Sequence, residues 1–506
     1  MVNNIMDFFH DKVRGTWFGK CLAGAIGMPY EGVPYTVNIS EDDICLSDVP
    51  NDDLELQLVW MDLLKRKGCA MQYEDLAELW LNKICHGCDE YSIAIHNMQN
   101  NFMPPASGWK NNFFASGMGA TIRSEIWALV FAGRPDAAAH FARMDAECDH
   151  WGDGVRGEIF MANAEAHACM NSDIKAALEF AFEQIGDKEC RLYRELAKVF
   201  DRYNNNMSEA DARNEILLSI QRHQNFTDCV MNLCFIVHAL LYGEGDFLKT
   251  VLLTISFGRD TDCTAATCGA FLGIASGMKV FPEKWLDKVN EKLSLSSFVT
   301  SIPGVPLTLT DLVDQTLALR EKLLTELPEN PYPAYEPYQP VPGLPQLDHS
   351  RWLIIDENRH DSEEIKRTLL KTGCCPEELK QFVVDFDTLF MDISQYTNQA
   401  GKLHLFSFLT VNNHDVRPEN IVCSATADAG MRMWMDDRRL MNHHSRQKML
   451  PSFHRAEGGG AFALPLAAGS RHLFHLELFS CLPPLRVCVM FGNTFNDHLD
   501  GFDFDI

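Results

Sequence analysis

The sequence predicts a helical domain followed by a small β domain, and two hydrophobic patterns with a proline-rich break between them support this. From residue 8 to about 326, apolar residues recur at intervals of three and four, as in 75–81 and 311–319. This spacing is the period of an amphipathic helix. We therefore expect a mainly all-α domain over residues 1–326.

A proline-rich segment ends the helical pattern. Seven prolines fall within residues 328–345. Because proline cannot continue a helix and pushes its neighbour into extended structure, we expect a semi-rigid linker over 327–349.

Short runs of β-branched, aromatic and aliphatic residues follow the linker. We expect strands at 381–386, 402–409, 431–436 and 473–478, with turn residues between them. Several short strands at such spacing are typical of a β-sandwich, which we expect over residues 350–506.

The composition narrows the classes of partner. The chain of 506 residues carries 70 acidic and 44 basic residues, for a net charge of −26. A negative field repels nucleic acid and anionic membranes, so neither is an expected partner. The expected partner, a small-molecule or glycoside substrate, follows from the motifs described below. No secretory signal or membrane-spanning run is recognised. Seventeen scattered cysteines suit a reducing compartment, so we expect a cytoplasmic protein.

The first of two acidic clusters is Asn51-Asp52-Asp53-Leu54-Glu55, at the head of an apolar helical run. This segment can be read as a capped amphipathic helix, since Asn and Asp accept hydrogen bonds from free amides at a helix start. Three carboxylates within four residues exceed what capping needs, and their repulsion would be relieved by a cation.

The second cluster, residues 258–264, reads Gly-Arg-Asp-Thr-Asp-Cys-Thr and opens a run of small residues, 265–270. A capped and tightly packed core helix would account for this pattern too. However, Asp260 and Asp262 add a second pair of carboxylates at a helix start, and oxygen ligands of this kind are what Mg²⁺ prefers. The two clusters together predict a metal site.

Five segments follow one another in order over roughly residues 10 to 290. They are a glycine-rich helix ending in Gly-x-Pro-x-Glu at 15–32, the Asn-Asp-Asp of 51–53, Gly-Ala-x-x-Arg at 119–123, the stretch from Asp145 to His150, and the second acidic cluster. Together they resemble motifs of the ADP-ribosylglycohydrolase family.

The resemblance implies an all-α fold of orthogonal helices that holds two Mg²⁺ ions. Asp52, Asp53, Asp260 and Asp262 would supply the metal carboxylates. The family has Thr or Ser at two further ligand positions, which are Asn51 and Cys263 here. The amide oxygen of Asn can still bind a hard cation.

Cys263 is a soft and poor ligand for Mg²⁺. One of the two metal sites is therefore expected to be weaker, or to be completed by water.

The resemblance also indicates catalytic and substrate-binding residues. Glu31 matches the glutamate beside the scissile bond, and Glu31 and Asp53 are the candidate catalytic residues. Cleavage at an anomeric carbon requires carboxylates to handle the water and the leaving group. Gly119, Arg123 and His150 lie in the matching motifs and are candidate substrate-binding residues. Asn112 is a further candidate for a different reason, because it lies in the Gly- and Pro-flanked loop 104–116, and loop residues often line a pocket. Arg123 could equally form a salt bridge with the acids, and His150 could be structural.

These residues predict a Mg²⁺-dependent hydrolase of an N- or O-glycosidic bond. The expected substrate is an ADP-ribosylated compound or another ribosyl or glycosyl compound. The second possibility is kept because the motifs are accompanied by no phosphate-binding loop and by no basic residues beyond Lys20, Arg123 and Arg259. The alternative is a catalytically inactive binding or structural protein on the same fold. The β domain is expected to be an accessory without a catalytic group.

Overall fold

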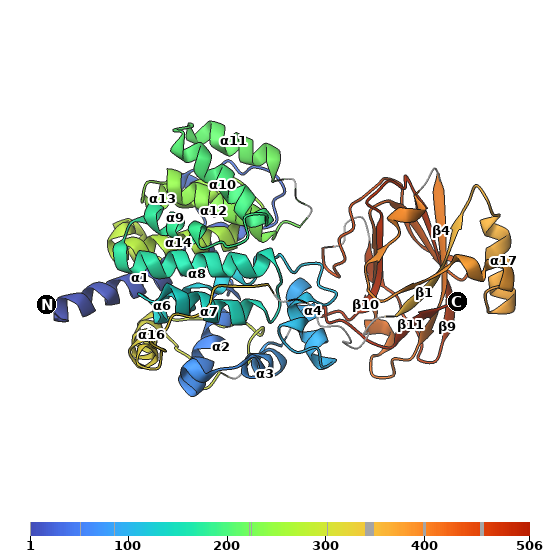
Figure 1. Cartoon of the computed structure of the whole chain (residues 1–506), viewed down its shortest axis with the longest axis horizontal. Coiled ribbons are helices and arrows are strands. Elements are labelled where there is room, and N and C mark those ends of the chain that lie inside the picture. Colours follow the sequence, from blue (N-terminus) through green and yellow to red (C-terminus); the bar gives the residue numbers. More distant parts are fainter. Residues whose placement is uncertain are drawn as a thin grey trace. The chain divides into compact units, whose positions relative to one another are not determined.

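The structure is a computed structural model that describes the chain except for residues 1, 51, 86, 222, 224, 301, 338, 340–348, 398–400 and 456–459. It divides into two compact units (Figure 1). The first unit comprises Met1–Cys85 and Asn97–Gln339, and the second comprises His86–His96 and Pro340–Ile506.

The first unit is helical, as the sequence predicts. Its α-helices are α1 (Val2–Gly27), α2 (Asp52–Lys67), α3 (Tyr73–Lys83), α5 (Ala106–Trp109), α6 (Glu125–Val130), α7 (Pro135–Ala146), α8 (Asp153–Asn171), α9 (Ile174–Glu183), α10 (Arg191–Asn204), α11 (Glu209–Ser219), α12 (Cys229–Tyr242), α13 (Phe247–Ile255), α14 (Thr261–Ser276), α15 (Glu283–Leu286) and α16 (Leu309–Leu324). Helix α4 (Asp89–Gln99) begins in the second unit. Short 3₁₀ turns include Met28–Tyr30 after α1 and Thr121–Arg123 before α6.

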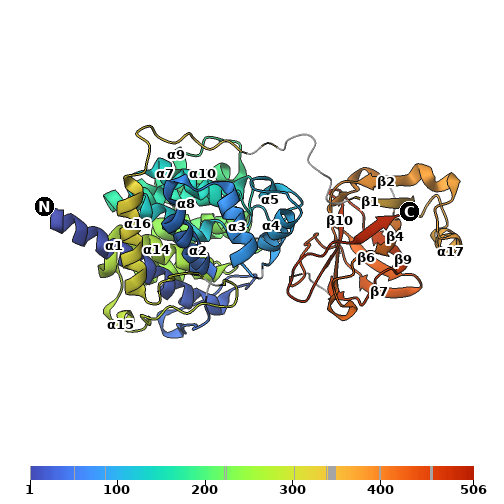
Figure 2. The same ribbon diagram turned by 90° about the horizontal axis from the view of Figure 1, so that it is seen from below.

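Helices α1 and α14 lie side by side through the centre of the first unit (Figures 1 and 2). Their contact is made by glycines. A Cβ atom on Gly19 would lie 2.2 Å from the carbonyl oxygen of Gly269, and one on Gly273 would lie 2.1 Å from that of Gly15. A larger residue at either position would push the two backbones apart, so the glycines set the spacing between the helices.

Helix α14 also corrects one expectation from the sequence. The segment Thr261–Val280 is long and apolar enough to cross a membrane by length and composition, although no such run was recognised. However, 78% of its apolar window is buried inside the protein. A mostly buried apolar helix is what a core position requires, because such a helix has no polar face to present to water.

The second unit contains two β-sheets. Its strands are β1 (Ser350–Asp356), β2 (Val383–Phe386), β3 (Met391–Asp392), β4 (Lys402–Val411), β5 (Val422–Ala427), β6 (Gly430–Met435), β7 (Arg438–His443), β8 (Ala461–Ala463), β9 (Arg471–Phe479), β10 (Arg486–Gly492) and β11 (Phe502–Asp505). Among the described residues, one sheet has the order β2-β1-β11-β4-β9-β6-β7 and the other β3-β10-β5-β8. Four of these strands, β2, β4, β6 and β9, were predicted within a few residues of their bounds.

The two sheets pack against each other as a sandwich. Leu405 and Leu476 from the larger sheet and Ala425 and Val487 from the smaller one share a single buried cluster. The sequence analysis missed one element here, helix α17 (Ser362–Thr372), which packs on the outer face of the larger sheet. Its boundaries are marked in the sequence by an Asp361 cap and by Gly373, which has a φ of 71°.

The proline-rich segment is only partly a spacer, because its first residues lie on helix α7. The backbone amide of Tyr332 donates to Asp136 at 3.0 Å, and its ring stacks on His140 with centroids 4.1 Å apart. Farther on, the ring of Tyr335 lies 5.4 Å from the guanidinium of Arg143. These contacts explain why the boundary between the units falls after Gln339.

Residues 86–96 belong to the second unit, although they lie in the part of the sequence that otherwise forms the first unit. Asp89 accepts a hydrogen bond from Ser452 at 2.9 Å and pairs with Arg455 at 2.9 Å. The hydroxyl of Ser92 donates to the carbonyl of Asn496 at 2.7 Å. A protein cut at the linker would therefore lack residues 86–96, which belong to the second unit.

A first prediction concerns the close contact of α1 and α14. Replacing Gly19 with Ala should lower the free energy of unfolding by about 1–3 kcal/mol, because the added methyl group overlaps a backbone oxygen that cannot move aside. Thermal or denaturant unfolding measures the effect. Gly186→Ala is the control, since a Cβ there meets no atom within 4 Å. Equal stability of the two variants would contradict the proposed constraint.

A second prediction concerns residues 86–96. A protease site placed within 340–348 and then cleaved should give two fragments that still co-elute in gel filtration, because residues 86–96 of the first fragment are part of the second unit. Asp89→Ala should weaken this association, since it leaves Ser452 and Arg455 without their buried partner. Fragments that separate completely before any mutation would show that these contacts are not stable in solution.

Candidate metal and active site

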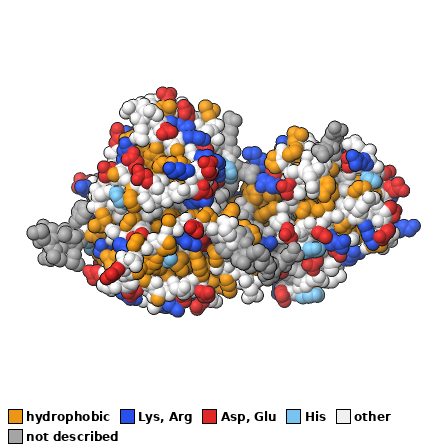
Figure 3. Space-filling view, viewed as in Figure 1, with side chains coloured by type: hydrophobic (Ala, Val, Ile, Leu, Met, Phe, Trp, Pro, Cys, Tyr) orange, Lys and Arg blue, Asp and Glu red, His pale blue; other side chains and the backbone are white. Residues whose placement is uncertain are grey.

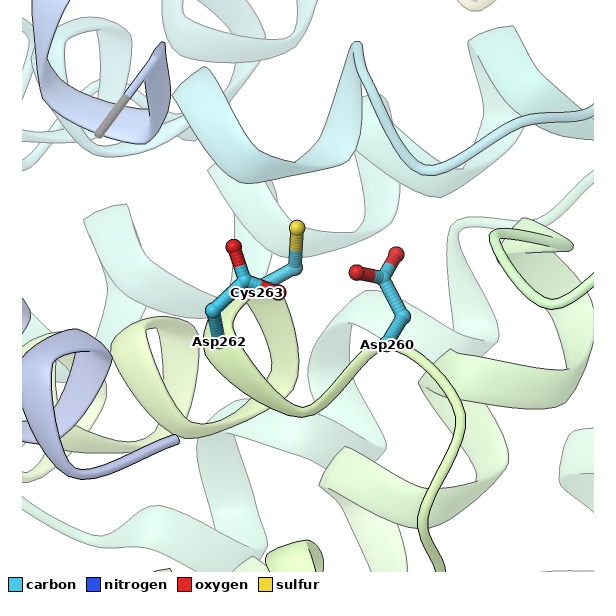
Figure 4. Close-up of side chains that lie close together, drawn as sticks. All are labelled: Asp260, Asp262 and Cys263. Carbon is cyan, nitrogen blue, oxygen red and sulfur yellow. The ribbon is translucent and has the colours of Figure 1, made fainter. Parts of the chain in front are cut away.

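The start of α14 brings two carboxylates and a thiol together. Asp260, Asp262 and Cys263 each offer a ligand atom, and these three atoms lie within 4.8 Å of one another. Their side chains point to the same side of the helix start (Figure 4). All three are buried, with 1%, 4% and 9% of their surfaces exposed.

Two oxygens of this group have no hydrogen-bond donor. Oδ2 of Asp260 and Oδ1 of Asp262 are buried and accept no hydrogen bond from the part of the chain that the structure describes. A buried carboxylate oxygen without a donor is costly unless a cation or another donor offsets its charge. The donor set thus fits a divalent cation, and the carboxylates are suited to a hard one.

Hydrogen bonds hold the start of α14, whose residues Asp260, Asp262 and Cys263 we call the acid group, against the end of α1 and the residues that follow it. The amide of Arg259 donates to the carbonyl of Val33 at 2.7 Å, and the amide of Gly32 donates to the carbonyl of Arg259 at 2.8 Å. The hydroxyl of Thr261 donates to the carbonyl of Gly27 at 2.9 Å. These three bonds bring Glu31, an exposed residue, to the acidic helix start.

The predicted carboxylates act on one another electrostatically. Burial raises the pKa of Asp260 well above its ordinary range, and the charges of Asp262, Glu31 and Asp53 raise it further. Burial also raises the pKa of Asp53, where Lys20 opposes the shift and Asp262 and Asp52 add to it. A bound cation would reverse these shifts by stabilising the ionised carboxylates.

The members of the first acidic cluster have different environments. Asp53 is buried and Asp52 is half-buried at the start of α2. The Asn51 prediction lies outside the described residues. Glu55 is held by Ser296, whose hydroxyl donates to it at 2.6 Å and whose amide also donates to it. The two hydrogen bonds from Ser296 to Glu55 therefore reduce the repulsion among Asp52, Asp53 and Glu55 without a cation.

A buried ion pair supports the helix that carries Asp53. The ammonium of Lys20 donates to Glu125 at 2.8 Å and to the carbonyl of Ile122 at 2.7 Å. Glu125 also accepts from Gln57 at 2.8 Å, and Gln57 donates back to the carbonyl of Asp53 at 2.8 Å. This junction joins α1, α2 and α6 directly behind the acid group.

Sequence reasoning noted Lys20 as a basic residue but missed this role. The available signal is its position on α1, since Thr16, Lys20 and Ala23 fall at the helical spacing of a buried face. A lysine on a buried face requires an acidic or carbonyl partner, but its spacing does not identify that partner.

Arg123 is part of a second buried network. It is fully buried, and its guanidinium pairs with Asp145 at 3.0 Å and with Asp149 at 2.7 Å. It also donates to the carbonyl of Gly119 at 2.9 Å, while Trp127 donates to Asp145 at 3.0 Å. Of the two roles considered for Arg123, the structure shows the salt bridge, although with these aspartates and not with the metal acids.

His150 and Asn112 hold the same loop. His150 is fully buried, pairs with Asp149 at 2.9 Å and accepts a hydrogen bond from the amide of Ala120 at 3.3 Å. The side-chain amide of Asn112 donates to the carbonyls of Gly108 and Asp149 at 2.9 and 2.7 Å. These contacts give both residues a structural role, and their contact with substrate stays a prediction.

A cavity of ≈ 360 Å³ borders the acid group on the side of Asp53. It lies between α1, the start of α2 and residues 288–294, and Lys20, Lys288 and Lys292 are among its lining residues. On the face seen in Figure 3, acidic and basic side chains of the first unit are interspersed over the surface. The large net negative charge does not form a single acidic surface there.

Glu165 on α8 gives a third prediction. Its burial raises the pKa of this carboxyl well above its ordinary range, Glu125 adds to the shift, and Lys20 opposes it. The folded protein therefore keeps a proton that the unfolded chain loses near pH 4.5. Above that pH the protein loses stability as the pH rises, until the folded state also loses the proton.

Glu165→Gln removes this pH dependence, because the amide stays neutral. We expect its melting temperature to exceed that of the native protein at pH 8 and to match it more closely at pH 4. Glu183→Gln, an exposed change at the end of α9, serves as the control and should alter neither value. A Glu165→Gln protein that is less stable at pH 8 would show that the carboxyl is ionised and paired.

Comparison with known proteins places these residues in a family. A family model described as ADP-ribosylglycohydrolase matches residues 6–326, which is more than half of the chain. The chain belongs to the ADP-ribosylglycohydrolase family. The resemblance inferred from the motifs is thereby confirmed. Members of this family are generally hydrolases that bind divalent metals, and the Asp260–Asp262–Cys263 group is a possible metal site.

Individual relatives are distant. A protein of Archaeoglobus fulgidus described as uncharacterized is 24% identical over 206 residues, which cover 40% of this chain and 63% of that protein. The match therefore spans less than two thirds of that relative. A solved structure described as an ADP-ribosylglycohydrolase-related protein complex is 16% identical, with a TM-score of 0.45, and the match covers 63% of this chain and 99% of that one.

Proposed function

We propose that this ADP-ribosylglycohydrolase family member is a divalent-cation-dependent hydrolase of an N- or O-glycosidic bond. The observation that carries the proposal is the meeting of Glu31, Asp53, Asp260 and Asp262 from three separate segments at one place. In support of the proposal, the charges of Asp262, Glu31 and Asp53 all act on the carboxyl of Asp260 and raise its pKa. Natural folds rarely hold four acids together, three of them buried, without a cation or a reaction to use them.

The metal would be held by Asp52, Asp53, Asp260 and Asp262, with Mg²⁺ and two ions as the expectation from the family resemblance. When bound, it would orient the sugar hydroxyls and lower the pKa of a bound water. This requires the four carboxylates to be ionised, and burial alone would oppose that.

Glu31 is suited to the proton transfers. It is exposed and follows the 3₁₀ turn Met28–Tyr30, and the backbone bonds of its neighbours to Arg259 fix its position. In the proposed reaction Glu31 takes a proton from the attacking water, whose oxygen bonds to the anomeric carbon. The departing group leaves with the electrons of the glycosidic bond and takes up that proton from Glu31, which returns to its carboxylate form.

The proposed substrate is a ribosyl or glycosyl compound, with an ADP-ribosylated compound as one member of the class. Of the three cations near the motifs, Lys20 pairs with Glu125 and Arg123 pairs with two aspartates. Arg259 is the remaining one, and it is half-buried. Lys288 and Lys292 also line the cavity beside Asp53, so the proposed class includes a substrate that carries phosphate. The sandwich would be an accessory to substrate recognition.

We further propose a cytoplasmic location. Each of the seventeen cysteines falls within the described residues and is a free thiol, as expected in a reducing compartment. The proposal includes no nucleic-acid or membrane partner, in keeping with the net negative charge.

A fourth prediction tests the reaction. The full chain, with and without millimolar Mg²⁺, should cleave at least one member of a panel containing ADP-ribosylated arginine and serine peptides, O-acetyl-ADP-ribose, nucleosides and simple glycosides. Glu31→Gln should lower the rate by about 10²–10⁴-fold, because it keeps the shape and removes the proton transfer.

Asp42→Asn is the matched control, since it removes an exposed carboxylate from a nearby 3₁₀ turn. It should retain the native rate. Near-native activity of Glu31→Gln would mean that another carboxylate performs the transfer. A chain that binds divalent cations but cleaves no member of the panel would favour the alternative, a binding or structural protein.

A further inference from the structure

The thiol of Cys263 replaces a hydroxyl at the metal site. The family pattern has Thr or Ser after the second acid pair, and this chain has Cys. Its sulfur belongs to the same 4.8 Å group as the carboxylate oxygens of Asp260 and Asp262. Figure 4 shows the sulfur on the same side of the helix start as both carboxylates.

We propose that this position selects a first-row transition-metal cation of the Zn²⁺, Co²⁺ or Fe²⁺ kind over Mg²⁺, with the sulfur of Cys263 as a ligand. The inference rests on the proposed function in that it assigns the metal of the same site. It differs from the family expectation, which is a site of oxygen ligands filled by Mg²⁺.

The chemistry of the three donors supports this choice. Mg²⁺ takes oxygen ligands in a strict octahedron and keeps much of its water, whereas thiolates favour Zn²⁺ and related cations. Two carboxylates and one thiolate supply three negative ligands and leave a fourth position for water or substrate. Three protein ligands and an open position are the usual arrangement of a catalytic zinc site.

Two buried carboxylate oxygens that accept no hydrogen bond from the described residues support cation binding by this group. Oδ2 of Asp260 and Oδ1 of Asp262 are buried, and no described residue donates a hydrogen bond to them. A cation placed among the three side chains would satisfy both oxygens at once.

A second cysteine on the same helix, Cys268, provides a comparison with Cys263. Cys268 lies five residues further along α14 and is fully buried. Its sulfur is 4.0 Å from the carbonyl of Ile236, and it belongs to no carboxylate group among the described residues. Cys263 differs because its thiol faces two acids, which makes it the member of the pair suited to bind a metal.

The experiment uses the full-length, metal-free protein and Co²⁺ as a spectroscopic probe. A cobalt–thiolate bond gives a charge-transfer band in the near ultraviolet, which oxygen ligands do not give. We expect the native protein to show this band, equimolar Zn²⁺ to abolish it, and millimolar Mg²⁺ to leave it in place.

Cys263→Ser restores an oxygen at this position. We expect it to lose the band, to bind Zn²⁺ at least about tenfold more weakly, and to bind Mg²⁺ more tightly than the native protein does. Loss of a partner behind a metal ligand already costs 10–100-fold in affinity, so loss of the ligand itself should cost no less. Cys268→Ser is the control and should keep the native band and affinities.

Other outcomes would overturn the inference. A band that persists in Cys263→Ser, Co²⁺ bound without any thiolate band, or displacement of Co²⁺ by Mg²⁺ at similar concentrations would each do so. Asp262→Asn provides a second variant, in which an intact thiol should bind Co²⁺ weakly. Melting of each metal-free variant identifies any that fail to fold, and the Mg²⁺ competition on the native protein decides the question without a variant.

These measurements separate the inference from the proposed function. A cysteine-dependent cobalt band in a protein that hydrolyses nothing would support the metal assignment and reject the hydrolase. Hydrolysis that requires Mg²⁺ and is unchanged in Cys263→Ser would support the hydrolase and reject this metal assignment.

Discussion

The close contact between α1 and α14 is the constraint on which the rest of the first unit depends. At Gly19 and Gly269 each backbone occupies the space that the other's side chain would take. The same contact continues to Gly27, where a Cβ would lie 2.1 Å from the carbonyl of Thr261. Because the two helices are this close, the residues after α1 reach the residues before α14, and Glu31 comes to lie beside Asp260.

Charge is distributed around this contact in two buried networks. Lys20 and Glu125 hold α1, α2 and α6 together behind the metal acids. Arg123 joins its loop to the end of α7 through Asp145 and Asp149. Buried ion pairs contribute little net stability compared with apolar packing, but they are costly to break and so fix one geometry. This suits a site in which several carboxylates must stay in place.

The site is therefore built in layers with different tasks. Helix packing sets the spacing, the buried ion pairs orient the helices, and the acids at the helix starts are the groups to which the proposed chemistry is assigned. The residues named as candidate substrate contacts, Asn112, Arg123 and His150, also hold a loop through hydrogen bonds. Arg123 and His150 are fully buried and Asn112 is half-buried, and the contact of these residues with substrate stays a prediction.

The sequence by itself determined the helical and β classes, the proline-rich break, the family motifs and both acidic clusters. Each of these is a local pattern of spacing or composition. Only the tertiary structure decided that Glu55 bonds Ser296, that Arg123 pairs with Asp145 and Asp149, and that residues 86–96 join the second unit. Local periodicity shows which face of a helix is buried but not what it meets, because partners distant in sequence are chosen by packing and by the need to pair each buried charge.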